Sequence, residues 1–113
     1  MAASSRSSFD QVRADAAAWG RFVESAVGAY LLAAGPPEGF TVEYWRKSSL
    51  EVDFVLERDG TVLGIEVKSG SNARATSGMS AFARAYPSAK VVLLGGEGLS
   101  IEELLRGRLR LFA

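Results

Sequence analysis

Alternating apolar and polar residues predict a β-hairpin in the middle of the chain. Apolar side chains recur at every second position on both arms, at Val52, Phe54 and Leu56 and again at Leu63, Ile65 and Val67. Such alternation is typical of strands with one face on a core. Between the arms lies Asp59-Gly60, a pair favoured in two-residue type I′ turns. The pattern therefore predicts a hairpin over 51–68 with this dipeptide as its loop.

That loop determines which polar residues face each other across the hairpin. Counting back from the turn, Asp53 lies opposite Glu66, and Glu51 lies opposite Lys68. Facing residues on antiparallel strands have Cβ atoms roughly 4.5–5.5 Å apart, and like charges placed so are destabilising. Two carboxylates at that spacing suit a divalent cation with oxygen ligands, Mg²⁺ or Mn²⁺. The alternative is a solvated sheet face whose charges pair diagonally, Asp53 with Lys68.

Helices and strands are predicted on both sides of the hairpin. A capping pattern at Ser8 indicates a helix start near Phe9, and helical spacing of apolar residues from Trp19 predicts a longer helix that ends before Gly35-Pro36-Pro37. The remaining expected elements are a strand over 41–46, a helix over 77–86, a strand over 90–94, a helix over 101–106 capped by Ser100, and a candidate edge strand over 109–112. The order α-β-β-β-α-β indicates an α/β fold with a central mixed sheet flanked by helices.

Length and composition limit the chemistry. The 113 residues suit one core, so we expect a single domain over 9–113 after a disordered start over 1–8. The chain contains no Cys and no His, which excludes disulfides, thiolate or His-ligated metal sites and a His general base. Any catalysis must therefore use carboxylates, lysine and an attacking water.

Charge and hydropathy set expectations for partners and location. The 13 basic and 13 acidic residues give a net charge of zero, whereas DNA-binding domains are usually strongly basic. We therefore expect weak DNA binding by this domain alone. No segment approaches the ~20 apolar residues that span a bilayer, and the start lacks the apolar region of a secretory signal. A cytoplasmic location is expected.

Asp53, the hairpin and the Glu66-Val67-Lys68 run resemble the PD-(D/E)XK nuclease superfamily, with Val52 in place of the usual proline. More narrowly, the chain is similar to the nuclease-like C-terminal domain of a family of uncharacterised bacterial and archaeal AAA+ ATPases. The similarity covers roughly 17–95, without an ATPase portion, and rests on 20–27, 44–46, 51–55 and 65–70.

The resemblance implies a restriction-endonuclease-like core and a division of roles in a metal site. Asp53 and Glu66 would hold Mg²⁺ or Mn²⁺, with the backbone carbonyl of Val67 as a further ligand. Lys68 would position or activate the attacking water and stabilise charge on the phosphate. Glu24, on the preceding helix, would be a ligand or a base acting through water.

Two of the acidic residues leave alternatives open. Glu24 borders the apolar stripe of its helix, with Gly20 and Gly28 one turn away on either side. These small residues would allow close approach of another backbone, but an ordinary solvated glutamate fits the same pattern. Glu51 would either orient Lys68 or merely neutralise it.

Two functional classes follow. The first is a metal-dependent endodeoxyribonuclease-type hydrolase that acts on DNA, as an effector of an AAA+ ATPase domain or subunit. The second is a catalytically silent nuclease fold for protein interaction or regulation of an ATPase. The set of Asp53, Glu66 and Lys68 favours the first class, and the neutral charge favours the second. A homodimer is compatible with either.

Overall fold

The computed structural model describes residues 15–47, 50–68 and 77–112. Its elements, in chain order, are α2 (Ala16–Glu38), β1 (Thr41–Lys47), β2 (Leu50–Arg58), β3 (Thr61–Val67), α3 (Ser77–Ala85), β4 (Lys90–Leu94) and α4 (Ile101–Leu105). The expected disordered start and the helix start near Phe9 lie outside the described residues. No helix within these ranges is both long and apolar enough to cross a membrane.

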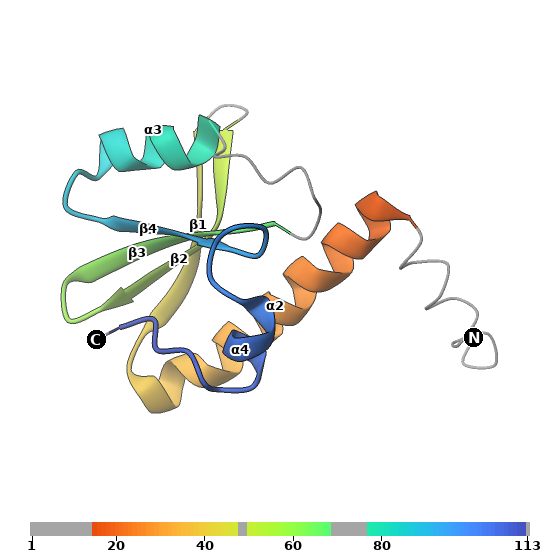
Figure 1. The fold of residues 1–113 in the computed structure, drawn as a ribbon. Coiled ribbons are helices and arrows are strands. Elements are labelled where there is room, and N and C mark those ends of the chain that lie inside the picture. Colours follow the sequence, from red (N-terminus) through yellow and green to blue (C-terminus); the bar gives the residue numbers. More distant parts are fainter. Residues whose placement is uncertain (1–14, 48–49, 69–76, 113) are drawn as a thin grey trace.

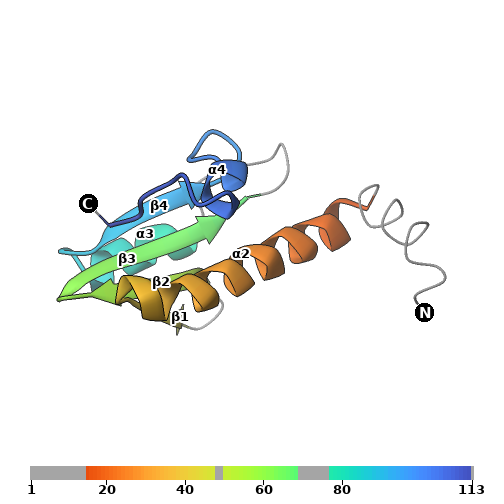
Figure 2. The same cartoon turned by 90° about the horizontal axis from the view of Figure 1, so that it is seen from below.

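The four strands form one mixed sheet in the order β1-β2-β3-β4. The pairs β1–β2 and β2–β3 are antiparallel, and β4 runs parallel to β3. Helix α3 covers one face of the sheet, and α2 and α4 cover the other (Figures 1 and 2). This arrangement confirms the predicted α-β-β-β-α-β order and the mixed sheet flanked by helices.

Helix α2 runs further than predicted, through Gly35, Pro36 and Pro37 to Glu38. The prediction that it ends before Gly35 is wrong: the helix continues through Pro36 and Pro37, and because these are among its last three residues, little helix follows the two hydrogen bonds that they remove. The helix stops at Gly39, whose φ is 81°. The Phe40 N–H then donates to Gly35 O at 3.0 Å, and the Gly39 N–H donates to Gly35 O at 2.7 Å and to Pro36 O at 3.3 Å. These bonds satisfy carbonyls at the helix end.

The hairpin has the predicted loop and register. Asp59 and Gly60 both have positive φ, 52° and 82°, as a type I′ turn requires. From this turn the pairs run through Leu56↔Leu63 to Phe54↔Ile65. The apolar alternation and the Asp-Gly loop therefore predicted the pairing of these strands correctly.

A β-bulge interrupts β2 near its start. The pairing between β1 and β2 shifts by one residue between Glu43 and Trp45, so that β2 carries one extra residue. Trp45 pairs with Val52, and the Trp45 ring packs edge-on against Phe82 of α3 at 5.5 Å. Since cross-strand partners share a face, Val52 lies toward α3 while Phe54 lies in the core beneath α2. The prediction that Val52 and Phe54 share one apolar face is therefore wrong, because uninterrupted alternation was assumed.

The main core lies between the sheet and the layer formed by α2 and α4. Its buried residues are Val23, Val27, Leu31, Phe40, Phe54, Leu56, Leu63, Ile65, Leu94 and Leu104. The predicted strand over 90–94 is observed, and α4 begins as expected, with Ser100 Oγ accepting from the Glu103 N–H at 3.1 Å.

The C-terminal tail packs differently from the prediction. Residues 109–112 form no strand, so the candidate edge strand is wrong. Gly107, at φ 74°, turns the chain after α4, and Leu109, Leu111 and Phe112 then pack against the main core. The Phe112 ring lies 5.7 Å from the Phe40 ring. Apolar burial under the sheet therefore replaces pairing at its edge.

Close packing of α3 on β3 generates the first prediction. A Cβ at Gly64 would lie 2.7 Å from Cε2 of the buried Phe82. We expect Gly64→Ala to lower the free energy of unfolding by about 1–3 kcal/mol, the usual cost of overpacking. Urea denaturation measures it. In a Phe82→Leu background, the loss of unfolding free energy caused by Gly64→Ala should be at least halved. An unchanged loss would show that contact with the Phe82 ring is not the cause.

Candidate functional site

The β2 bulge and the open end of the hairpin bring Asp53 to the end of β3. The paired stretch of β2 and β3 ends at Phe54↔Ile65, and Asp53 and Glu66 are the next residues on the two strands. Asp53 Oδ2 accepts a hydrogen bond from the Val67 N–H at 2.8 Å. This bond takes the place of a ladder bond and holds the Asp53 carboxylate against β3.

Glu66 is the buried acid of the group. Its Oε2 lies 3.8 Å from Lys68 Nζ, and its Oε1 is buried with no hydrogen-bond partner in the part of the chain that the structure describes. Burial, followed by the negative charge of Asp53, raises the pKa of Glu66 from its ordinary 4.5 to about 7, although Lys68 acts in the opposite direction. A buried acceptor without a partner costs on the order of 1–3 kcal/mol. Glu66 Oε1 is therefore an atom that a cation would satisfy.

Helix α2 places Glu24 beside Asp53. Burial, a hydrogen bond with the Asp53 side chain and the charge of Asp53 raise the pKa of Glu24 to about 7, with smaller effects from Glu66 and Glu51. Gly28 lies one turn further along the helix, where a Cβ would be 3.1 Å from the Phe54 ring. The close approach of the helix to the strand that the glycines indicated is thus present at Gly28.

The structure pairs Glu51 and Lys68 with different partners from those predicted. Glu51 pairs with Arg46 across β1 and β2 and forms an exposed ion pair with it at 3.6 Å. Lys68 instead forms an ion pair with Glu66. The expected position of Glu51 opposite Lys68 is wrong because the β2–β3 pairing ends at Phe54. The diagonal pairing of Asp53 with Lys68 is not among the ion pairs of the described residues.

The residues predicted to bind Mg²⁺ or Mn²⁺ form a small set of oxygen ligands. Within 15–47, 50–68 and 77–112, no group of three or more Asp, Glu, Cys or His residues is placed to hold a metal ion. The predicted set needs only Asp53, Glu66 and a backbone carbonyl, that of Val67. The free Glu66 Oε1 fits this smaller set. The ligand roles themselves stay predictions.

A groove beside Glu24 was not predicted from the sequence. It has a volume of about 400 Å³ and is lined by Glu24, Ser25, Gly28, Ala29, Leu32, Tyr44 and Phe54. We call it the α2–β1 groove. Tyr44 reaches it from β1 because it lies two residues after Val42, on the same face of the strand, and opposite the β2 residues next to the bulge. The sequence signal was an aromatic residue in a short strand, which does not distinguish a core position from a groove.

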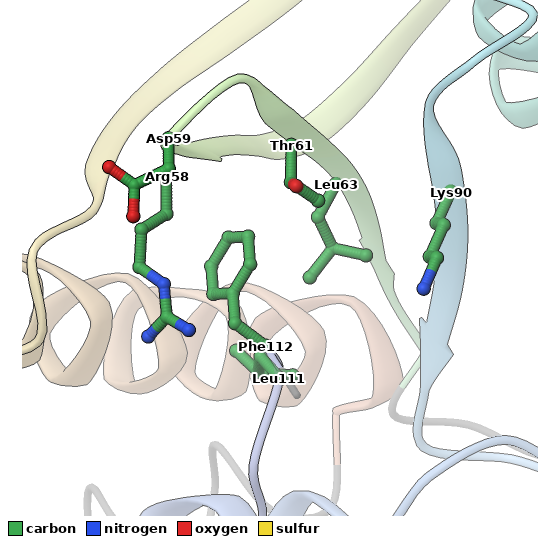
Figure 3. A pocket seen from close by; sticks show the side chains of 7 residues that line it. All are labelled: Arg58, Asp59, Thr61, Leu63, Lys90, Leu111 and Phe112. Carbon is green, nitrogen blue, oxygen red and sulfur yellow. The ribbon is translucent and has the colours of Figure 1, made fainter.

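A second hollow, of about 220 Å³, lies at the other end of the hairpin (Figure 3). Arg58 and Lys90 line it together with Thr61 and Phe112, and the Arg58 guanidinium sits 5.0 Å above the Phe112 ring. None of the predicted site residues lines it. Five residues of strand, about 17 Å, separate Arg58 from Asp53. This hollow is therefore distinct from Glu24, Asp53 and Glu66, which we call the acidic cluster.

These features define a mixed α/β domain with an acidic cluster and a lysine at the open end of its hairpin. Residues 19–106 match the family described as "Domain of unknown function (DUF4143)". The chain belongs to this family. The matched range contains Glu24, Asp53, Glu66 and Lys68. No curated protein matches the chain.

Solved structures give a distant likeness. An fdxN element excision controlling factor protein from Anabaena variabilis is 16% identical, with a TM-score of 0.39 over 62% of this chain and 67% of that one. An XisH family protein from Nostoc punctiforme is 17% identical, with a TM-score of 0.38 over 61% of this chain and 67% of that one. Both TM-scores are below 0.5, so these likenesses say nothing about function.

The two raised pKa values predict how stability depends on pH without metal. Because the pKa of Glu24 and of Glu66 is about 7 in the folded protein and 4.5 ordinarily, the folded state binds more protons between these values. The contribution of these two groups to stability should therefore be full below pH 4.5 and be lost as the pH rises through 7. Urea denaturation in chelator at several pH values measures this fall.

Glu66→Gln should make that fall shallower. At pH 8 the variant should be more stable than the parent by on the order of 1–2 kcal/mol, a value reduced for partial solvent access. Glu57→Gln, an exposed change on β2, is the matched control and should leave the slope as it is. Equal slopes for the parent and Glu66→Gln would contradict the prediction.

Proposed function

We propose that this domain is a metal-dependent nuclease of the PD-(D/E)XK superfamily that hydrolyses DNA phosphodiester bonds as an effector of an AAA+ ATPase. The observation that carries the proposal is the buried Glu66 Oε1, which has no hydrogen-bond partner among the described residues and lies next to Asp53 and Lys68. If Glu66 had only a structural role, the protein would be more stable with this oxygen exposed to water or bonded to a hydrogen-bond donor. A divalent cation would satisfy it.

In this proposal the carboxylates and the lysine have different roles. Asp53 and Glu66 would hold Mg²⁺ or Mn²⁺ with the Val67 carbonyl, and the Val67 N–H already fixes one oxygen of Asp53. Such an ion supplies a Lewis acid that polarises phosphoryl oxygen and lowers the pKa of water. Lys68, held near Glu66, would stabilise negative charge developing on the phosphate. Glu24, beside Asp53, would accept the proton of the attacking water.

A second candidate is a catalytically silent module for interaction with an ATPase. Two observations favour it. Asp53 already accepts from Val67 N–H and shares a hydrogen bond with Glu24, so the acids partly satisfy one another. The net charge of zero also gives little attraction for duplex DNA.

Metal binding at the cluster predicts a gain in stability that depends on Asp53. With Mn²⁺ at tenfold its Kd, the parent should gain about 1.4 kcal/mol, and Asp53→Asn should gain little. In chelator the variant should be neutral or slightly more stable, by less than ~1 kcal/mol, because it removes a like charge. Thermal melts with and without Mn²⁺ measure both effects. Glu57→Gln should respond as the parent does; an equal response of Asp53→Asn would place the ion elsewhere.

Nuclease activity predicts a requirement for Lys68. In Mg²⁺ or Mn²⁺, Lys68→Ala should slow cleavage of a labelled DNA about 10²–10³-fold, the scale for losing one group that stabilises transition-state charge. It should keep the metal-induced gain in stability. Lys90→Ala changes an exposed lysine at the start of β4, away from the cluster, and is the control that should cleave at the parental rate. Absence of cleavage by the parent, with the Asp53-dependent metal response intact, would favour the silent module.

A further inference from the structure

The α2–β1 groove combines features that the proposed chemistry does not use. Its volume of about 400 Å³ lies within the range of roughly 300–1,000 Å³ for clefts that hold small ligands. Two large side chains that line the groove are exposed to solvent: Tyr44 is 82% exposed and Leu32 is 64% exposed. The buried Phe54 contributes apolar surface between them. An exposed aromatic ring in an open groove offers a face for stacking.

The groove leads directly to the acidic cluster. Glu24, Gly28 and Leu32 follow each other at four-residue spacing, so they share one side of α2. From Glu24 to Leu32 this side extends about 12 Å. On β1, Tyr44 lies at the bulge, opposite the β2 segment that contains Asp53. A ligand in the groove therefore lies beside the predicted metal ligands.

A free cation extends the same side of the helix beyond the cluster. Arg21 is exposed, precedes Glu24 by three residues and Ser25 by four, and forms no ion pair within the described part of the chain. Along this side of α2 the order is thus the Arg21 cation, the Glu24 carboxylate, and an apolar stretch that faces Tyr44 of β1. A nucleic-acid strand, with its anionic backbone and flat bases, has complementary features.

Resting on the nuclease proposal, we infer that the groove binds single-stranded DNA, with a base stacked on Tyr44 and a neighbouring phosphate near Arg21 and the acidic cluster. Base stacking on aromatic side chains is available to unpaired strands, since the faces of paired bases are already stacked within a duplex. Duplex affinity comes from many cationic contacts, which this groove with one arginine beside it does not provide.

Fluorescence anisotropy with a labelled oligothymidine and a duplex of equal length tests the inference. The Lys68→Ala background in Mg²⁺ keeps the strand from being consumed. The single strand should bind about tenfold tighter than the duplex, and Tyr44→Ala should weaken it about tenfold. Tyr44→Phe keeps the aromatic face and should stay within about twofold. Tyr86→Ala removes an exposed tyrosine just after α3, across the sheet, and should leave strand binding unchanged. Leu32→Glu, on the opposite wall, should also weaken binding.

The outcomes separate this inference from the nuclease proposal. Failure of the oligothymidine to bind, or binding that ignores both Tyr44→Ala and Leu32→Glu, overturns the inference. A homodimer that Tyr44→Ala dissociates in sedimentation would overturn it too, because a second copy would then fill the groove. If Tyr44→Ala leaves DNA cleavage unchanged, the nuclease proposal stands and the inference about the groove is rejected. If single-stranded DNA binding depends on Tyr44 but neither cleavage nor a metal response is found, binding in the groove is supported and the nuclease proposal is rejected.

Discussion

The hydrogen bond from the Val67 N–H to Asp53 Oδ2 is the interaction on which the arrangement of the acidic cluster depends. Beyond Ile65, β3 keeps its pairing with β4 while it leaves β2, and the bulge in β2 begins at the same place. A side chain therefore supplies the bond that the backbone of β2 no longer makes. The result is an open corner of the sheet in which carboxylates face inward and Glu66 is buried. Burial at this corner, with added repulsion from Asp53, raises the pKa values of Glu24 and Glu66.

Local signals in the sequence predicted most of the fold. The Asp59-Gly60 turn and the alternation on both arms determined the hairpin register, and the continuous apolar run over 90–94 identified β4. The errors arose where tertiary packing decides. Helix α2 contains its two prolines within the last three residues, and the bonds from Gly39 and Phe40 to Gly35 O close its end. The tail over 109–112 buries its apolar residues under the sheet, which its alternating pattern does not distinguish from a strand.

The candidate site was predictable only close to the paired part of the hairpin. Asp53 and Glu66 were predicted by extending the register one residue beyond Phe54↔Ile65, the last pair of β2 with β3, and they are the next residues on the two strands. The sequence does not reveal the bulge, because the apolar Val52 would suit a buried position on either face of the sheet. Beyond the bulge the predicted register no longer holds, and Glu51 pairs with Arg46 of β1 instead of with Lys68. Tyr44 was missed for a different reason, because an aromatic residue in a short strand fits a core position as well as a groove.

The sheet topology also has a consequence for the order of folding. The β2–β3 hairpin joins neighbours in the chain, whereas β4 reaches β3 only after the α3 crossover. Contacts between residues close in sequence form faster than those between distant ones. We therefore expect the nascent chain to bring Asp53 and Glu66 together before β4 docks beside Glu66. The acids would then meet while hydrated, and their repulsion would grow only as the last strand docks.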